Sequence, residues 1–195
     1  HSGVYAGISP MEMYKRYGFT SYDCSQALQL PWETYEILSD VLAVQSPEVV
    51  VVETDHFFYD SKSVIRRNNN KRLGLSVYPF YETHVAWKDG FDPSARNALK
   101  GYMYTDVSRP FKGDCKMKPS DKKYKLGKRH EKYLKKIYEL CRERGTRLCL
   151  VELPSLVMWD YEKHNTIREF AETHGINFLD MNERYDDTGI NWETD

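Results

Sequence analysis

Side chains able to do acid-base chemistry follow two short apolar runs in this 195-residue sequence. Asp55 and His56 come directly after VVVVET, and Glu152 ends RLCLVE. An adjacent carboxylate and imidazole could exchange protons with a substrate, but neighbouring side chains commonly point apart, so capping of a loop is the alternative. Glu152 is likewise expected either to be part of a functional site or to cap a helix.

Three further residues could contribute to chemistry from other parts of the chain. Ser2 carries a hydroxyl, which becomes a nucleophile only beside a histidine that a carboxylate orients. His84 and Trp87 lie in an aromatic segment that suits substrate contact, with an ordinary packed histidine as the alternative. The other histidines near charged helical neighbours are expected at the surface: His130, His164 and His174.

Several classes of site are excluded by missing motifs. The sequence has no glycine-rich phosphate loop, no HExxH pair and no carboxylate spacing that compels a glycosidase interpretation. Its four cysteines have no CxxC spacing, which disfavours a zinc site. No metal and no cofactor is expected. Cys141 and Cys149 are interpreted as buried free thiols, although the sequence leaves one disulfide open.

Helical and strand patterns alternate along the sequence. Apolar residues recur at helical spacing from Pro31 to Pro47, and the continuous run from Val49 to Val52 then predicts a strand buried on both faces. The same unit returns as a helix over 128–144 and the strand RLCLVEL. Such alternation indicates a parallel α/β sheet with helices on both faces, whose strand ends share one edge where sites form. Shorter elements are expected in PMEMYKRYG (helix), FTSYD (strand), 159–173 (helix) and INFLD (strand).

The length suits a single domain over residues 1–195, with an irregular insertion at 60–121 that resembles a lid or binding loop. Basic and acidic residues nearly balance, 28 against 29, so no global attraction to nucleic acid or an anionic membrane is expected. The segment from Lys112 to Lys136 is locally basic, with eleven Lys or Arg against three acids. It predicts a solvated face, a nucleic-acid contact or a contact with an anionic envelope polymer. No apolar run is long enough to span a bilayer, and no leader pattern is visible.

Three sequence pieces in a fixed order carry a family resemblance. They are SGVYAGISP at 2–10, YDCS with Gln29 at 22–29, and PEVVVVE at 47–53. Together they resemble the extracytoplasmic branch of the SGNH (GDSL-like) hydrolases, the group containing the D-alanyl-transfer protein of teichoic acid modification and the alginate O-acetylation proteins. A looser similarity continues through HVAWKDG, KGYMY and the closing INFLDMNERYDDTGINWETD.

The resemblance implies a three-layer α/β/α, flavodoxin-like fold and a serine acyl-transfer site. Ser2 matches the nucleophile, and the amide of Gly3 with the Asp23, Ser25 and Gln29 loop matches the oxyanion or substrate-binding region. Asp55, His56, His84 and Trp87 are the other substrate-contact candidates. The family's strand before the serine and its Asp-x-x-His block would lie outside residues 1–195, so the chain is expected to be clipped at both ends.

Some positions depart from the family pattern. Gly3 stands where many relatives have histidine, and Ser25 stands where the wider family has glycine. The stretch VVETDHFF lacks the Gly-x-Asn of the family's third block. A terminal serine without a catalytic role is therefore the alternative for Ser2.

By resemblance, the expected function is an acyl esterase or acyltransferase acting on a cell-envelope carbohydrate or polymer. It would be extracytoplasmic and anchored to the membrane by a segment outside this chain. Because the expected catalytic block follows Asp195, the 195-residue chain alone is predicted to be inactive towards a chromogenic acetyl ester. The competing hypothesis is a non-catalytic module of the same fold that binds an anionic glycopolymer through the aromatic insertion and the basic segment from Lys112 to Lys136. A nucleic-acid partner is not expected.

Overall fold

The computed structural model describes residues 2–59, 98–108, 110–111, 113 and 117–194. His84, Trp87 and most of the insertion expected at 60–121 lie outside these residues. Among the described residues of that insertion there are turns but neither a helix nor a strand.

A parallel sheet of three strands forms the centre of the fold. Its strands are β1 (Val49–Glu53), β2 (Arg147–Glu152) and β3 (Asn177–Asp180), in the order β1-β2-β3. The ladder pairs Val52 with Leu150, and Leu150 with Phe178. The expectation of an α/β fold with a parallel sheet is therefore confirmed.

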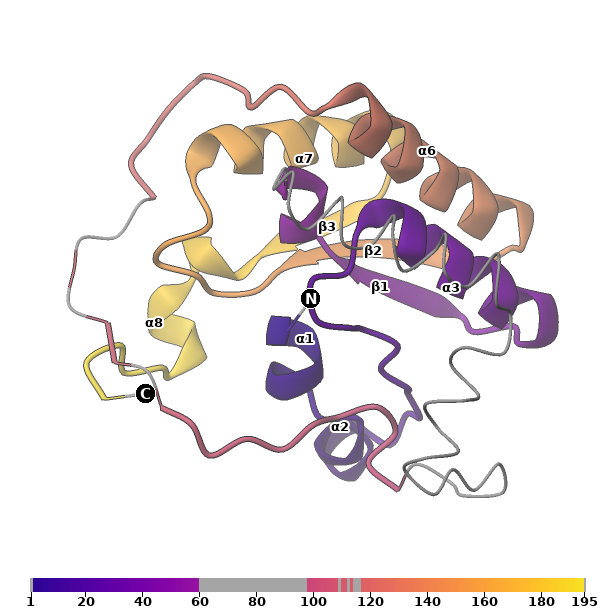
Figure 1. Ribbon diagram of the computed structural model, residues 1–195, viewed down its shortest axis with the longest axis horizontal. Helices are drawn as coiled ribbons and strands as arrows, with labels where there is room; N and C mark the ends of the chain where they lie inside the picture. The colour runs from indigo at the N-terminus through magenta and orange to yellow at the C-terminus, as the bar shows by residue number, and fades with distance from the viewer. Residues whose placement is uncertain (1, 60–97, 109, 112, 114–116, 195) are drawn as a thin grey trace, which may run out of the picture.

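Three long helices lie on one side of the sheet, and the two short N-terminal helices lie on the other (Figure 1). The long helices are α3 (Pro31–Val44), α6 (Lys128–Glu143) and α7 (Tyr161–His174), while α1 (Ser2–Gly7) and α2 (Pro10–Tyr17) are short. The ends of α7 agree with its sequence. The Asp160 side chain accepts a hydrogen bond from the Lys163 amide, and Gly175 ends the helix at a φ of 64°, which glycine adopts without strain.

The hydrophobic core lies between the sheet and these long helices. Ile137, Leu150 and Ile167 are fully buried there, as is the ring of Trp159. The opposite face of the sheet is only partly covered, because Val49, Val51 and Leu179 are 39%, 59% and 45% exposed. The prediction of a first strand buried on both faces is thus wrong: Val50 and Val52 are buried, whereas the alternate valines of the pleat are not.

The N-terminal region also differs from prediction. FTSYD, at residues 19–23, forms no strand. The Asp23 amide donates a hydrogen bond to the Lys100 carbonyl, and the Asp23 side chain turns back to accept one from the Ser25 amide. An aspartate bonded two residues onward favours a turn over an extended ladder, which explains the loss of the strand.

Shorter elements complete the chain. Each of three short helical segments follows the sheet's carboxyl edge, either directly or after a few residues: η1 (Asp55–Phe58), η2 (Met181–Glu183) and α8 (Tyr185–Thr188). Cys24, Cys141 and Cys149 are free thiols. None of the described helices has the length and apolar character needed to cross a bilayer.

Candidate functional site

The three strands all end in a buried carboxylic acid. Glu53, Glu152 and Asp180 are the last residues of β1, β2 and β3, and each is less than a tenth exposed. Glu152 pairs with Asp180 in the ladder, whereas Glu53 pairs with Val151. Because side chains alternate along a strand, Glu152 and Asp180 share the face covered by the long helices, and Glu53 lies on the opposite face.

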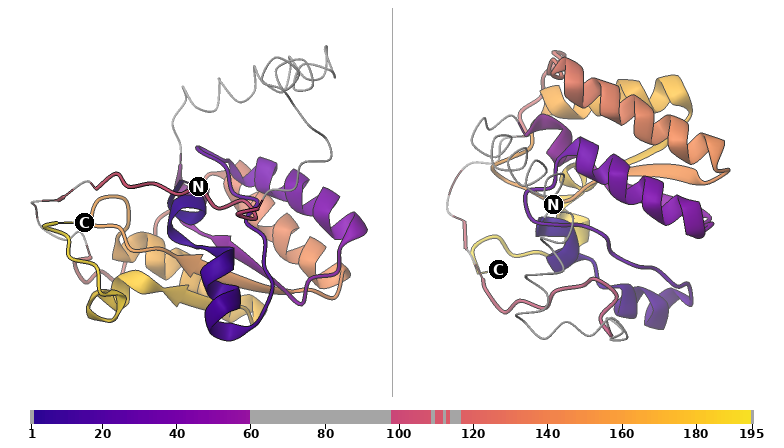
Figure 2. Two further views of the ribbon diagram at one scale, coloured as in Figure 1. Left: turned by 90° about the horizontal axis from the view of Figure 1, so that it is seen from below. Right: turned by 45° about the vertical axis from the view of Figure 1, so that its right-hand side comes forward.

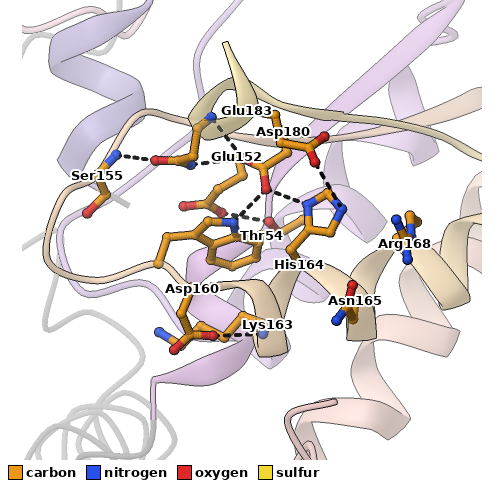
Figure 3. Close-up of polar contacts among 12 residues, drawn as sticks. Thr54, Glu152, Ser155, Asp160, Lys163, His164, Asn165, Arg168, Asp180 and Glu183 are labelled. Carbon is orange, nitrogen blue, oxygen red and sulfur yellow. Dashed lines mark hydrogen bonds and ion pairs between the residues drawn. The ribbon is translucent and has the colours of Figure 1, made fainter. Parts of the chain in front are cut away.

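The pKa values of both glutamates are raised above the ordinary value of this side chain. Burial, followed by the charge of Asp55, raises the pKa of Glu53 to about 8. Burial, followed by the charge of Glu53, raises the pKa of Glu152 well above its ordinary value. The Thr54 hydroxyl lies 2.7 Å from Glu152 Oε2 (Figure 3). Glu152 therefore does not cap a helix, as the alternative interpretation had it, but joins two strand ends.

His56 is the centre of one buried hydrogen-bond network. Its Nε2 lies 3.2 Å from Thr34 Oγ1, which in turn accepts a hydrogen bond of 2.9 Å from the side-chain nitrogen of Gln29. On its other side, Nδ1 lies 4.0 Å from Glu53 Oε2. Burial lowers the pKa of His56 to about 3, so the imidazole is neutral and suits a framework role better than general base catalysis near neutral pH.

Asp55, although adjacent to His56, has a different partner. One of its carboxylate oxygens lies 3.7 Å from Lys163 Nζ, which also donates to the Met158 carbonyl. Burial raises the pKa of Asp55, and the charge of Lys163 offsets part of that rise. Asp55 and His56 thus contact separate groups, and together they do not form an acid-base pair directed at one point.

His164 is the centre of a second buried network, at the end of β3 (Figure 3). Its Nδ1 lies 2.6 Å from Asp180 Oδ2, and the same oxygen accepts a 2.7 Å hydrogen bond from Trp159 Nε1. The other oxygen of Asp180 accepts two hydrogen bonds of 2.9 Å from Asn182, through its backbone and side-chain nitrogens. A carboxylate that only accepts fixes the imidazole proton on Nδ1.

The sequence expectation for two of the helical histidines is wrong. His164 is 2% exposed and His130 is 6% exposed, so neither lies at the surface. His174 is half-buried and stacks on Phe170, with its ring edge against Tyr138. Charged neighbours in the sequence misled the prediction because both helices, α6 and α7, are amphipathic, so a buried side chain can stand between exposed charged ones. Helical spacing of His164 with Ile167 and Ala171, both buried, was the signal available.

A cleft of about 340 Å³ opens beside the second network. It lies between α7 and β3, and its polar walls include His164, Arg168 and Glu183. Glu183 Oε1 is 3.7 Å from His164 Nε2, which is buried and has no hydrogen-bond partner among the described residues. A smaller cleft of about 210 Å³ lies on the outer side of α7, between Asp121 and Glu172.

The residues expected at the nucleophile and its oxyanion region lie in α1 and in the loop before α3. Ser2 begins α1, and this end of α1 lies beside the carboxyl end of β1 (Figures 1 and 2). Gly3 is exposed on the first turn. Asp23 Oδ1 accepts a 2.7 Å hydrogen bond from the Ser25 amide, so that amide is already engaged and does not point freely at a substrate oxyanion.

Two polar atoms of this loop are buried without a partner within the described residues, namely Asp23 Oδ2 and Ser25 Oγ. The side chain of Gln29, the last residue of the loop, donates a hydrogen bond to the Thr34 hydroxyl and accepts one from the Gln26 backbone amide. The structure therefore brings Gln29 and His56 into one network, and it leaves Asp23 and Ser25 in a separate turn against Gly101. There, a Cβ on Gly101 would lie 1.9 Å from the Asp23 carbonyl oxygen, so only glycine fits.

No family model, curated protein or solved structure matches this chain. Within the described ranges, no group of three or more His, Cys, Asp or Glu side chains is arranged to hold a metal ion.

Proposed function

We propose that this chain belongs to an SGNH-like serine acyl esterase or acyltransferase whose substrate is a cell-envelope carbohydrate or polymer. The observation that carries the proposal is the position of Ser2. It begins α1 beside the carboxyl end of β1, at the edge where open parallel sheets form their sites (Figure 1). In the proposed three-layer, flavodoxin-like fold this is the edge used for chemistry.

The proposed chemistry follows from a serine as the first residue of a helix. Ser2 Oγ would attack an acyl carbonyl carbon, forming an acyl ester on the serine and releasing the alcohol of the donor. An acceptor hydroxyl or water would then take the acyl group and free the serine. The first amides of a helix have no intrahelical acceptor, so the amide of Gly3 is free of helical hydrogen bonds and suited to hold the oxyanion.

The general base of this proposal is a histidine in an Asp-x-x-His block after Asp195. His56 is a poor substitute, because its Nε2 lies against Thr34 and its pKa is lowered to about 3 by burial. A base with so low a pKa gives little driving force for proton transfer from a serine hydroxyl. An extracytoplasmic, membrane-anchored location belongs to the same proposal.

The test compares two forms of the protein in the hydrolysis of a chromogenic acetyl ester. One form is the 195-residue chain, and the other is extended by the residues that its gene encodes after Asp195. We expect turnover only in the extended form, and we expect Ser2→Ala to abolish it. Ser39→Ala is the matched control, because Ser39 donates to the Tyr35 carbonyl within α3, away from the sheet edge. Turnover that survives Ser2→Ala would contradict the proposal.

The second candidate function is a non-catalytic module that binds an anionic glycopolymer. It is favoured by the charge of residues 117–136, which contain nine Lys or Arg against two acids, and eight of these nine cations are exposed. Lys122, Lys125, Lys128 and Lys132 are all exposed there. This candidate predicts binding to poly(glycerol phosphate) that weakens with salt and with substitution of these four lysines by glutamine. Equal binding by the substituted chain would exclude it.

A further inference from the structure

The imidazole of His164, which lines the cleft between α7 and β3, has one nitrogen for which the described residues provide no hydrogen-bond partner. His164 Nε2 is buried and, among the described residues, accepts or donates no hydrogen bond. A buried polar atom left unpaired costs about 1–3 kcal/mol, so such atoms are rare and call for an explanation. The other ring nitrogen is fixed on Asp180 at 2.6 Å, which leaves Nε2 as the ring atom whose bonding capacity is unused among the described residues.

The only carboxylate oxygen placed near Nε2 by the described contacts is Glu183 Oε1. The two atoms are 3.7 Å apart, which is too long for a hydrogen bond. An ammonium or hydroxyl bridging them through two hydrogen bonds of about 2.8 Å would need a separation of about 4.6 Å. Two ligands of one tetrahedral zinc ion, with bonds of about 2.0–2.2 Å, lie about 3.3–3.5 Å apart. The observed separation is closer to that of two metal ligands.

The surroundings of His164 also match a metal-binding histidine. Histidines that bind metal ions commonly donate their second N–H to a carboxylate, which fixes the ring and makes the free nitrogen a stronger donor to the metal. Asp180 occupies that position, and Trp159 and Asn182 hold Asp180 in place (Figure 3). Glu183 is 44% exposed at its side chain, so water could complete the coordination from the cleft.

The geometry points to an open binding site for a transition-metal dication of the zinc class, ligated by His164 Nε2 and Glu183 Oε1. This inference does not depend on the proposed reaction of Ser2. Imidazole combined with carboxylate favours zinc, nickel or copper over magnesium or calcium. With two protein ligands the site is weaker than a structural zinc site, and Arg168 on the cleft wall opposes the cation further.

The experiment titrates Zn²⁺ into the 195-residue chain and follows the imidazole nitrogens by long-range ¹H–¹⁵N spectra at about pH 8, where an ordinary histidine is neutral. The chain carries Cys24→Ser, because an exposed thiol would compete for the ion. We expect the Nε2 resonance of His164 to shift on addition of Zn²⁺ and not of Mg²⁺. Loss of this resonance in His164→Gln assigns it.

Two exposed substitutions test the site without disturbing the core. Glu183→Gln should weaken Zn²⁺ binding by about tenfold or more, because it removes one of two ligands. Arg168→Gln should tighten binding, because it removes a repelling charge. Glu169→Gln is the matched control: Glu169 pairs with Lys123 outside this cleft, and its substitution should leave the affinity unchanged.

Three results would overturn the inference. The first is a His164 Nε2 resonance unaffected by millimolar Zn²⁺. The second is unchanged affinity in Glu183→Gln. The third is protonation of both His164 nitrogens at about pH 8, which would mean that the ring is an imidazolium paired with both carboxylates and has no lone pair to give.

Discussion

Two buried histidines lie near the same edge of the sheet, and their partners differ. His56 follows β1 and has the Thr34 hydroxyl at one nitrogen and the Glu53 carboxyl, whose pKa is raised to about 8, near the other. His164 comes from α7 and contacts the Asp180 carboxylate, which is held by four hydrogen bonds. The two imidazoles are equally inaccessible, at 4% and 2% exposed.

The two histidines show that equal burial can accompany different electrostatic surroundings. Burial alone disfavours the charged imidazole, and for His56 few contacts offset it. A carboxylate beside His164 instead orients the ring, and its second nitrogen lies 3.7 Å from Glu183, which lines a cleft. We therefore interpret His56 as part of the framework and His164 as a group that can bind a ligand.

The largest expected effect comes from Asp180→Ala. This change removes the carboxylate to which Trp159 Nε1, His164 Nδ1 and the Asn182 backbone amide are bonded. Removing one member of such a buried network typically costs about 3–5 kcal/mol of unfolding free energy. Urea unfolding measures it, with the exposed Asp187→Ala as the control. A loss below about 1 kcal/mol would mean that the His164 network is no more constrained than the surface.

Measuring stability over a range of pH tests whether the pKa of Glu53, beside His56, is raised in the folded protein. The pKa of Glu53 rises from 4.5 to about 8 on folding, so the folded state binds more protons than the unfolded state between these values. The contribution of Glu53 to stability is therefore full below about pH 4.5 and is lost as the pH rises towards about 8. Glu53→Gln should remove this part of the pH dependence in urea unfolding. Parallel curves for the two proteins would show that Glu53 is ionised in the fold.

Removal of a single hydroxyl should have an intermediate effect. Thr34→Val keeps the shape of the side chain but removes the group between Gln29 and His56. Leaving those partners unpaired should cost about 1–3 kcal/mol. Thr173→Val, which deletes an exposed hydroxyl on α7, provides the comparison. Equal losses in the two variants would refute the network around His56.

The smallest effect is expected for Glu183→Gln in metal-free buffer. Its carboxylate lies 3.7 Å from His164 and is 44% exposed, and such pairs contribute about 0–1 kcal/mol. Thermal unfolding with chelator present measures this. A loss comparable to that of Asp180→Ala would place Glu183 in the core network and not on the wall of the cleft.

Much of the fold could be predicted from the sequence because its signals are local. Helical spacing and terminal residues such as Pro31 and Gly175 locate the long helices, and the apolar runs locate β1 and β2. Exposure of Val51 could not be foreseen, because a continuous run of valine does not reveal which face a helix will cover.

The candidate site was harder to predict because its contacts are long-range. Asp180 and His164 are sixteen residues apart, and Thr54 and Glu152 are ninety-eight apart, so no spacing rule links them. The position of Asp55 and Glu152 at the carboxyl edge of the sheet could be inferred, because both come at the end of apolar runs. Which partner each side chain would choose depends on packing that no local pattern encodes.

The most direct test of this contrast is the protonation state of His56 at about pH 5, read from its ring nitrogens in a long-range ¹H–¹⁵N spectrum, where an unperturbed histidine is charged. Our account predicts a neutral imidazole with one bound proton, because its pKa is lowered to about 3. Two protonated nitrogens at that pH would contradict the framework role of His56 and the comparison that rests on it.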